Sequence, residues 1–194
     1  MNTFQFVNRD DPSEIFWGEI APCDHVVQIY EADEVFFATL TSFVAEGINS
    51  GDGVIVIATR PHLDELEAGL EARQTNHLDA RERDQYIPVD AEEALEKFMV
   101  GSWPDEDRFK EFVAGLLCRA RKDSGRVRAF GELVALLWAR GHNGATVRLE
   151  HLWHQLCETD NFCLLCAYPR IGFTQDAEAS VKELCAVHSK VLAG

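Results

Sequence analysis

Short apolar runs alternate along the chain with segments in which apolar residues recur every three or four positions, and few folds accommodate that alternation. The runs span residues 25–30, 53–59, 86–89, 127–130 and 162–168. The segments between them have the pattern of amphipathic helices. Strands that alternate with helices are joined by right-handed crossovers and form parallel sheets. The sequence therefore predicts an α/β fold with a doubly wound, mainly parallel sheet of five strands flanked by helices.

The same pattern predicts the domain organisation, because no linker, internal repeat or low-complexity tract interrupts it. We expect one α/β domain over residues 25–194 and an irregular N-terminal arm or edge strand over residues 1–24. The domain should end in a helix with one apolar face, formed by Val181, Leu184, Cys185, His188 and Val191.

The formal net charge of −15 argues against a nucleic-acid binder, since phosphate contacts need clustered Lys and Arg, and it disfavours anionic membranes. No segment approaches the roughly 18 consecutive apolar residues that a membrane span needs. The first residues include acidic and polar side chains, whereas a signal peptide has a basic start and an apolar run. We expect a cytoplasmic protein without nucleic-acid or membrane partners, whose six cysteines are reduced thiols.

Ligands of doubly wound sheets bind beyond the carboxyl ends of the strands, so the residues that follow the strands are the first candidates for a site. They are Tyr30, Glu31, Thr59, Arg60, Asp90, Gly131, Glu132, Tyr168 and Pro169. Strand ends are often polar only because loops are solvated. The convergence of carboxylates, an arginine and two tyrosines at one edge nevertheless predicts a ligand site there.

The turn after the first strand is unsuited to a nucleotide. A phosphate-binding turn offers glycines and a lysine at the start of a helix. Here Glu31, Asp33 and Glu34 occupy that position, and their charges would repel a triphosphate. We therefore expect neither ATP hydrolysis nor tight nucleotide binding.

Three further ionisable residues each allow two interpretations. Glu132 precedes the apolar run LVALLW, so it either binds a ligand or stabilises the dipole of its own helix. His25 begins the first strand, remote from the expected site, and we expect a structural role for it. His188 is either a hydrogen-bonded core histidine or a ligand contact.

The cysteines and histidines do not have the spacing of a metal or redox site. Cys163 and Cys166 form a CxxC within a predicted strand, where the two thiols should point to opposite faces. His151 and Cys157 lie about 120° apart around a helix. A redox CxxC normally begins a helix, and no G-x-S-x-G motif is present. We expect no metal, no cofactor and no catalytic residue.

Several segments together resemble one known family. They read HVVQIYEADEVFF, FVAEGINSGDGVIVIAT, DAEEALEKFMVGSWPDEDRF, VRAFGELVALLWARG, VRLEHLWHQL and FCLLCAYP, followed by the segment containing His188. In order and spacing they are similar to the MEDS family, the methanogen/methylotroph DcmR-like sensory domain, over nearly the whole chain from about Cys23 onward. The resemblance implies a RecA/KaiC-like fold that has lost its phosphate loop. It places family motifs at His25, Tyr30, Glu132, Glu150, Cys166, Tyr168 and His188.

The resemblance implies a sensory protein that binds a small, hydrocarbon-derived molecule. We therefore expect a non-enzymatic signalling module that reports through a separate protein partner, because no kinase or helix-turn-helix segment is recognisable; self-association is left open. The candidate ligand-binding residues are Tyr30, Glu31, Arg60, Glu132, Cys166, Tyr168 and His188. The alternative is a degenerate ATPase-like interaction subunit without a metabolite. An enzyme using Glu132 with a tyrosine or histidine ranks last, because no nucleophile–base pair is evident.

Overall fold

A parallel sheet forms the centre of the protein, with strand order β1-β9-β2-β8-β7-β3-β4. The computed structural model describes residues 5–7, 17, 21, 23–122, 125–172 and 188–193. The sheet contains β1 (Gln5–Val7), β2 (His25–Tyr30), β3 (Gly53–Ala58), β4 (Tyr86–Asp90), β7 (Val127–Gly131), β8 (Cys163–Pro169) and β9 (Lys190–Ala193). Every pair of neighbouring strands runs parallel.

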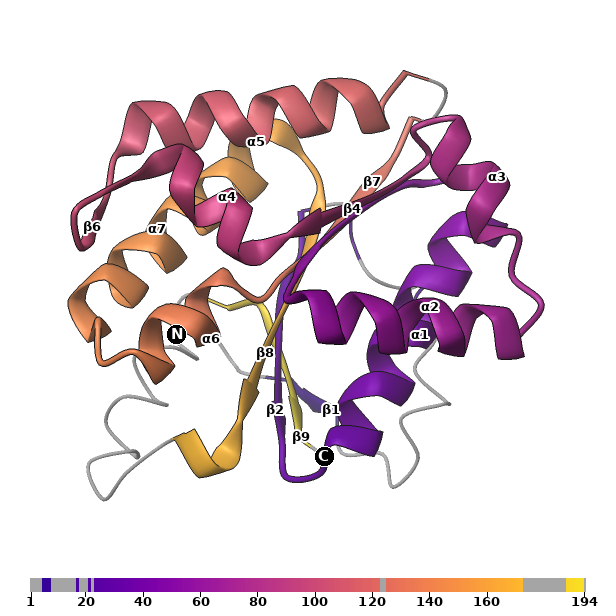
Figure 1. Ribbon diagram of the computed structural model, residues 1–194, viewed down its shortest axis with the longest axis horizontal. Coiled ribbons are helices and arrows are strands. Elements are labelled where there is room, and N and C mark those ends of the chain that lie inside the picture. Colours follow the sequence, from indigo (N-terminus) through magenta and orange to yellow (C-terminus); the bar gives the residue numbers. More distant parts are fainter. Residues whose placement is uncertain are drawn as a thin grey trace.

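Helices cover both faces of this sheet (Figure 1). One face carries α1 (Asp33–Asn49), α2 (Arg60–Ala72) and α3 (His77–Glu82). The other carries α4 (Ala91–Phe98), α5 (Glu106–Ala120), α6 (Leu133–Ala139) and α7 (Asn143–Asp160). A separate antiparallel hairpin, β5 (Met99–Val100) and β6 (Trp103–Pro104), joins α4 to α5. None of the helices within the described residues combines the length and apolar character needed to cross a bilayer.

The predicted α/β class and the mainly parallel, helix-flanked sheet are confirmed, but the strand number was wrong. Six strands from β2 onward replace the expected five, and the three-residue β1 extends the sheet at its edge. A relationship to RecA/KaiC-like ATPases stays a prediction.

The additional strand β9 replaces the end of the helix expected around His188. Val191 lies in β9 opposite Val27 of β2, and His188 lies just before the strand. The run KVLA is too short for its periodicity to distinguish a strand from a helical turn, and pairing with β2 and β1 decides the outcome. The other three residues of that expected face, Val181, Leu184 and Cys185, lie outside the described residues.

Successive side chains of a strand point to opposite faces of the sheet, and this alternation decides which side chains of the central strands lie beneath which helices. In β2, Val26 packs in the apolar layer of α1–α3, whereas Val27 packs in the layer of α4–α7. In β8, Leu165 faces the first layer, and Leu164 and Cys166 face the second. Odd-numbered residues of β2 and even-numbered residues of β8 are therefore directed toward α7.

The sheet also has a switch point at the carboxyl ends of β3 and β7. These strands are neighbours, yet β3 leads into α2 on one face and β7 leads into α6 on the other. The backbone N–H of Glu132, which follows β7, donates to the carbonyl of Ile57 in β3 at 2.9 Å. This is the place where a doubly wound sheet opens its crevice.

Candidate functional site

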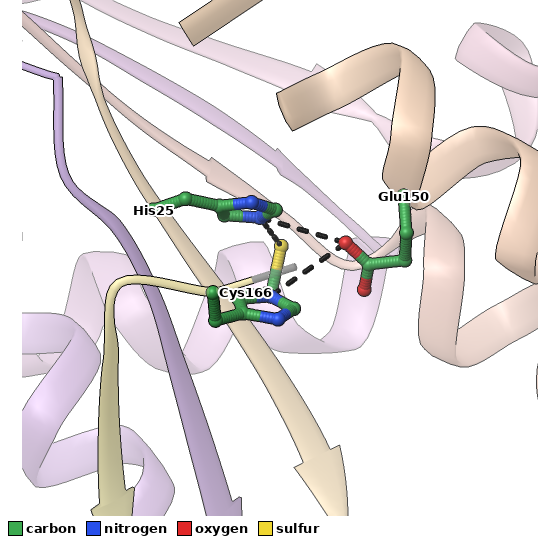
Figure 2. A group of neighbouring side chains, drawn as sticks. His25, Glu150 and Cys166 are labelled. Atoms are coloured by element: carbon green, nitrogen blue, oxygen red, sulfur yellow. Dashed lines mark hydrogen bonds and ion pairs between the residues drawn. The ribbon is translucent and has the colours of Figure 1, made fainter. Parts of the chain in front are cut away.

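A cluster of ionisable and hydrogen-bonding side chains is buried between the sheet and α7. We call it the buried polar cluster, and it consists of His25, Glu150, Cys166, Tyr168 and His188. Each of these residues is at most 5 % exposed. Figure 2 shows His25 and Cys166 reaching from their strands toward Glu150 on the helix. Polar side chains so completely removed from water require partners, and here they are one another's partners.

Strand register and helix periodicity bring these residues together. Val27 of β2 lies opposite Cys166 of β8, so His25, two residues earlier, projects from the same face. Glu150 lies in the middle of α7, on the buried side that Leu149 and Trp153 also form. His188 enters from the segment that leads into β9, the other neighbour of β2.

Four of the side chains direct donor atoms toward a common centre. His25 Nε2 lies 3.4 Å from Cys166 Sγ and 3.5 Å from Glu150 Oε2. His188 Nε2 lies 3.6 Å from the same carboxylate oxygen, and the two imidazole rings are 3.9 Å apart between centroids. All four donor atoms lie within 4.8 Å of one another. We call His25, Glu150, Cys166 and His188 the four-donor set; its atoms are of the types that could hold a metal ion.

The second oxygen of Glu150 is fixed by Tyr168. The phenol hydroxyl donates a hydrogen bond to Glu150 Oε1, which directs Oε2 toward the histidines. Burial raises the pKa of Glu150 to about 7, and the hydrogen bond from Tyr168 opposes that rise. The carboxyl group is therefore poised to gain or lose a proton near neutral pH.

Cys166 has the environment of an unreactive thiol. Burial raises its pKa well above the ordinary value, and the nearby Glu150 carboxylate raises it further. A cysteine nucleophile needs the opposite, a cationic neighbour that lowers the thiol pKa. This environment favours binding over covalent catalysis at Cys166.

A second polar group lies at the switch point, around Glu132. Glu132 Oε2 accepts a hydrogen bond from the backbone N–H of Thr59 at 2.9 Å, and Oε1 lies 2.8 Å from His62 Nδ1. The hydrogen bond to Glu132 raises the pKa of His62, although partial burial opposes it. Burial raises the pKa of Tyr30 to about 12, with the charges of Asp33 and Glu132 adding to the effect.

The structure divides the seven candidate ligand-binding residues among three places. Cys166, Tyr168 and His188 belong to the buried polar cluster. Tyr30 and Glu132 lie near the switch point, with Tyr30 in the apolar layer of α1–α3. The remaining two are engaged at the surface.

Those two surface residues are Glu31 and Arg60. Glu31 is paired with Arg170, and both side chains are more than half exposed. Arg60 Nε lies 3.6 Å from Asp90 Oδ2 and is also largely exposed.

The expected grouping of Glu132 with both tyrosines does not occur. Tyr30 and Tyr168 project from opposite faces of the sheet, because their positions in the paired strands differ by one residue. Tyr168 therefore binds Glu150, while Glu132 turns toward Thr59 and His62.

Reasoning from the residues alone had not joined His25 and Glu150 to the site. His25 was assigned a structural role because it begins its strand, far from the edge where such sheets bind ligands. Glu150 did carry a signal, since it is a carboxylate within an apolar helical stripe that includes Leu149 and Trp153. A charge in such a stripe must be paired or protonated when the helix packs.

The expected divergence of the CxxC thiols is confirmed. Cys163 lies in the apolar layer of α1–α3, and Cys166 lies in that of α4–α7. The five cysteines among the described residues are free thiols, while Cys185 lies outside the described part of the chain.

Comparison with known proteins assigns the chain to a family. A family model described as MEDS, MEthanogen/methylotroph, DcmR Sensory domain, matches residues 24–189. The chain belongs to the MEDS family. The match includes every residue of the buried polar cluster, so the cluster is part of the MEDS domain itself. None of the curated proteins compared with the MEDS chain matches it.

Proposed function

We propose that this MEDS protein is a non-enzymatic sensory module that recognises its stimulus at the buried polar cluster and reports it through protein contacts. The observation that carries the proposal is that the cluster residues come from four separate segments, namely β2, α7, β8 and the segment that leads into β9. An occupant that contacts all four would change how α7 and β9 pack against the sheet. A ligand shifts a conformational equilibrium only by binding the two states differently, and such a site provides that difference.

The chemistry of the residues favours binding over catalysis. The thiol of Cys166 is held protonated by burial, which removes the most nucleophilic side chain of the cluster from reaction. Glu132 is engaged by Thr59 and His62. These features, together with membership of a sensory family, support a sensor rather than an enzyme.

Nucleotide is an unsuitable stimulus for this protein. The loop after β2 and the first turn of α1 place Glu31, Asp33 and Glu34 where a phosphate-binding loop would need glycine and lysine. Small hydrocarbon derivatives are the ligand class that the family resemblance implies. The buried polar cluster offers such molecules both hydrogen-bonding groups and apolar neighbours such as Leu164.

Thermal unfolding in the presence of candidate molecules tests the proposal. The probes are one- and two-carbon alcohols, aldehydes and chlorinated alkanes, titrated against the wild type and Glu150→Gln, with Mg-ATP as a control. We expect at least one probe to raise the wild-type melting temperature saturably, by roughly 5–10 °C at a hundredfold excess over Kd, and not that of Glu150→Gln. Equal stabilisation of both proteins, or stabilisation by micromolar ATP, would contradict the proposal.

One observation favours the second candidate, an interaction subunit without a metabolite. The β5–β6 hairpin exposes Val100 and Trp103, which are 53 % and 52 % exposed. Large apolar side chains that remain in water frequently mark a contact surface. If Trp103→Ala abolished partner binding while Glu150→Gln left it unchanged under all conditions, the interaction subunit would be the better account.

A further inference from the structure

The four-donor set has the composition of a transition-metal site. It offers two imidazole nitrogens, one thiol sulfur and one carboxylate oxygen. Zinc in proteins is bound by these three ligand types, whereas Mg²⁺ and Ca²⁺ require oxygen ligands almost exclusively. The mixture of nitrogen and sulfur therefore selects a borderline ion such as Zn²⁺ over the hard cations.

The spacing of the donors also fits. Zinc binds nitrogen and oxygen at roughly 2.0–2.2 Å and thiolate sulfur at roughly 2.3 Å, so two ligands of a tetrahedral ion lie roughly 3.3–3.8 Å apart. The distances from His25 Nε2 to Cys166 Sγ and Glu150 Oε2 are 3.4 and 3.5 Å. The distance from His188 Nε2 to Glu150 Oε2 is 3.6 Å. These three separations match edges of a coordination tetrahedron, and all four donor atoms lie within 4.8 Å of one another.

Glu150 supplies an oxygen that accepts no hydrogen bond from the described residues. This oxygen, Oε2, is buried, and the two imidazole nitrogens lie 3.5 and 3.6 Å away. Oε1 is occupied by Tyr168, which is how a neighbouring hydrogen bond orients a metal-binding carboxylate. A buried carboxylate oxygen without a hydrogen bond costs free energy unless a cation or a proton reaches it.

We propose that the four-donor set binds one divalent transition-metal ion, with Zn²⁺ as the representative. The proposal rests on the function proposed above and adds a metal ion to the same cluster, where a small-molecule stimulus would meet it. It replaces the expectation of no metal, which considered the CxxC and the residues spaced along α7 but not donors from four separate segments. Binding deprotonates Cys166 and any protonated Glu150, and the released protons pass to solvent.

Metal content and cobalt spectroscopy test the site directly. The full chain is stripped with EDTA, dialysed with Zn²⁺ and then freed of excess metal. We expect about one zinc ion per folded chain by elemental analysis. Titration of the stripped protein with Co²⁺ should produce the intense visible bands of tetrahedral cobalt together with a thiolate-to-cobalt charge-transfer band. Less than about one tenth of an ion per chain, and only the weak spectrum of hydrated cobalt, would overturn the proposal.

Matched variants show which side chains bind. Cys166→Ser should remove the charge-transfer band, whereas Cys163→Ser, in the same strand but on the opposite face, should retain it. His188→Gln should lose zinc, whereas His154→Gln should keep it, although the His154 ring stacks 6.1 Å from that of His25. If a variant and its matched control lost zinc or the charge-transfer band to the same extent, and circular dichroism showed that both were folded, the metal would bind elsewhere.

Tyr168→Phe tests the orienting hydrogen bond separately. Removing the hydroxyl leaves all four donors in place but frees Glu150 Oε1, so zinc affinity should fall by roughly 10–100-fold. An unchanged affinity would exclude Tyr168 as a positioning residue. Metal content and cobalt spectra register the site whether or not any signal follows, so failure of the metal proposal and failure of the sensory proposal are distinguishable.

Discussion

Three of the buried carboxylates among the described residues have three different kinds of partner. Asp52 accepts hydrogen bonds from Arg128 Nη2 at 2.5 Å and Nε at 3.0 Å, so a permanent cation balances its charge. Glu132 has the titratable His62 and a backbone N–H. Among the described residues, the groups that contact Glu150 are imidazoles, a phenol and a thiol, and none of these is a permanent cation. The environment of Glu150 is therefore the one most changed by an added ion.

At the residue scale, Glu132→Gln should lower the free energy of unfolding by about 1–3 kcal/mol. The amide can still accept from Thr59, but it loses the charge that pairs with His62. Urea unfolding measures the effect, with Glu31→Gln as the control, since an exposed pair such as Glu31–Arg170 contributes about 0–1 kcal/mol. Equal losses in the two variants would show that Glu132 only serves its own helix.

The pairing of His62 with Glu132 should also make stability depend on pH. The pKa of His62 is raised in the folded protein, so the pair stabilises fully below the unfolded histidine pKa of about 6.5. The contribution is lost as the pH rises through the higher folded pKa. The stability difference between wild type and His62→Gln should therefore shrink as the pH rises above about 6.5. A difference that grows with pH would reverse the assigned direction.

At the scale of elements, α1 lies unusually close to the sheet at Gly47. A Cβ atom built there would lie 2.7 Å from Arg128 Cδ and 2.7 Å from Val54 Cγ2. Arg128 is held in place because Nη1 donates to the carbonyl of Phe43 in the same helix. The close approach allows one guanidinium to join α1 and the loop before β3, where Asp52 lies, to its own strand β7.

Substitution of helical glycines should have opposite effects at two positions. Gly47→Ala should destabilise by about 1–3 kcal/mol, because Arg128 and Val54 must shift. Gly115→Ala in α5, where nothing lies within 4 Å of a new Cβ, should stabilise by about 0.5–1 kcal/mol through helix propensity. Thermal and urea unfolding measure both variants. Stabilisation by Gly47→Ala would contradict the packing described for α1.

Elements of the sheet were predictable to different degrees. The run at β3 is apolar throughout, as a strand covered on both faces requires, and it was predictable from its own residues. The last strand was not, because β9 has four residues and takes its conformation from pairing with β2 and β1. Local sequence pattern detects a long buried strand, but not a short one stabilised by distant neighbours.

The buried polar cluster was harder to predict than the fold. Its members extend from His25 to His188, and their contacts depend on a strand order that local pattern does not reveal. The resemblance to the MEDS family named all five residues, but physical reasoning placed the ligand site at the carboxyl edge. That edge does gather Glu132, Thr59 and His62, so it remains a second polar site of the molecule.

At the scale of the whole molecule, the cluster connects the two ends of the described chain. β9 pairs with β2 on one side and with β1 on the other, so His188 precedes a strand that joins the N-terminal segments. α7 covers the same region through Glu150. Occupation of the four-donor set should therefore raise the free energy of local opening of both α7 and β9, while that of α2 and α3 on the opposite face is unaffected.

Amide hydrogen exchange of the metal-free and zinc-loaded protein tests this coupling most directly, since exchange reports the free energy of local opening. We predict that zinc slows exchange in residues 143–160 and 190–193, that residues 60–82 exchange at unchanged rates, and that Glu150→Gln abolishes the difference. Exchange that zinc leaves unchanged in α7 and β9, or slows equally in α2 and α3, would contradict the coupling of the four-donor set to α7 and β9.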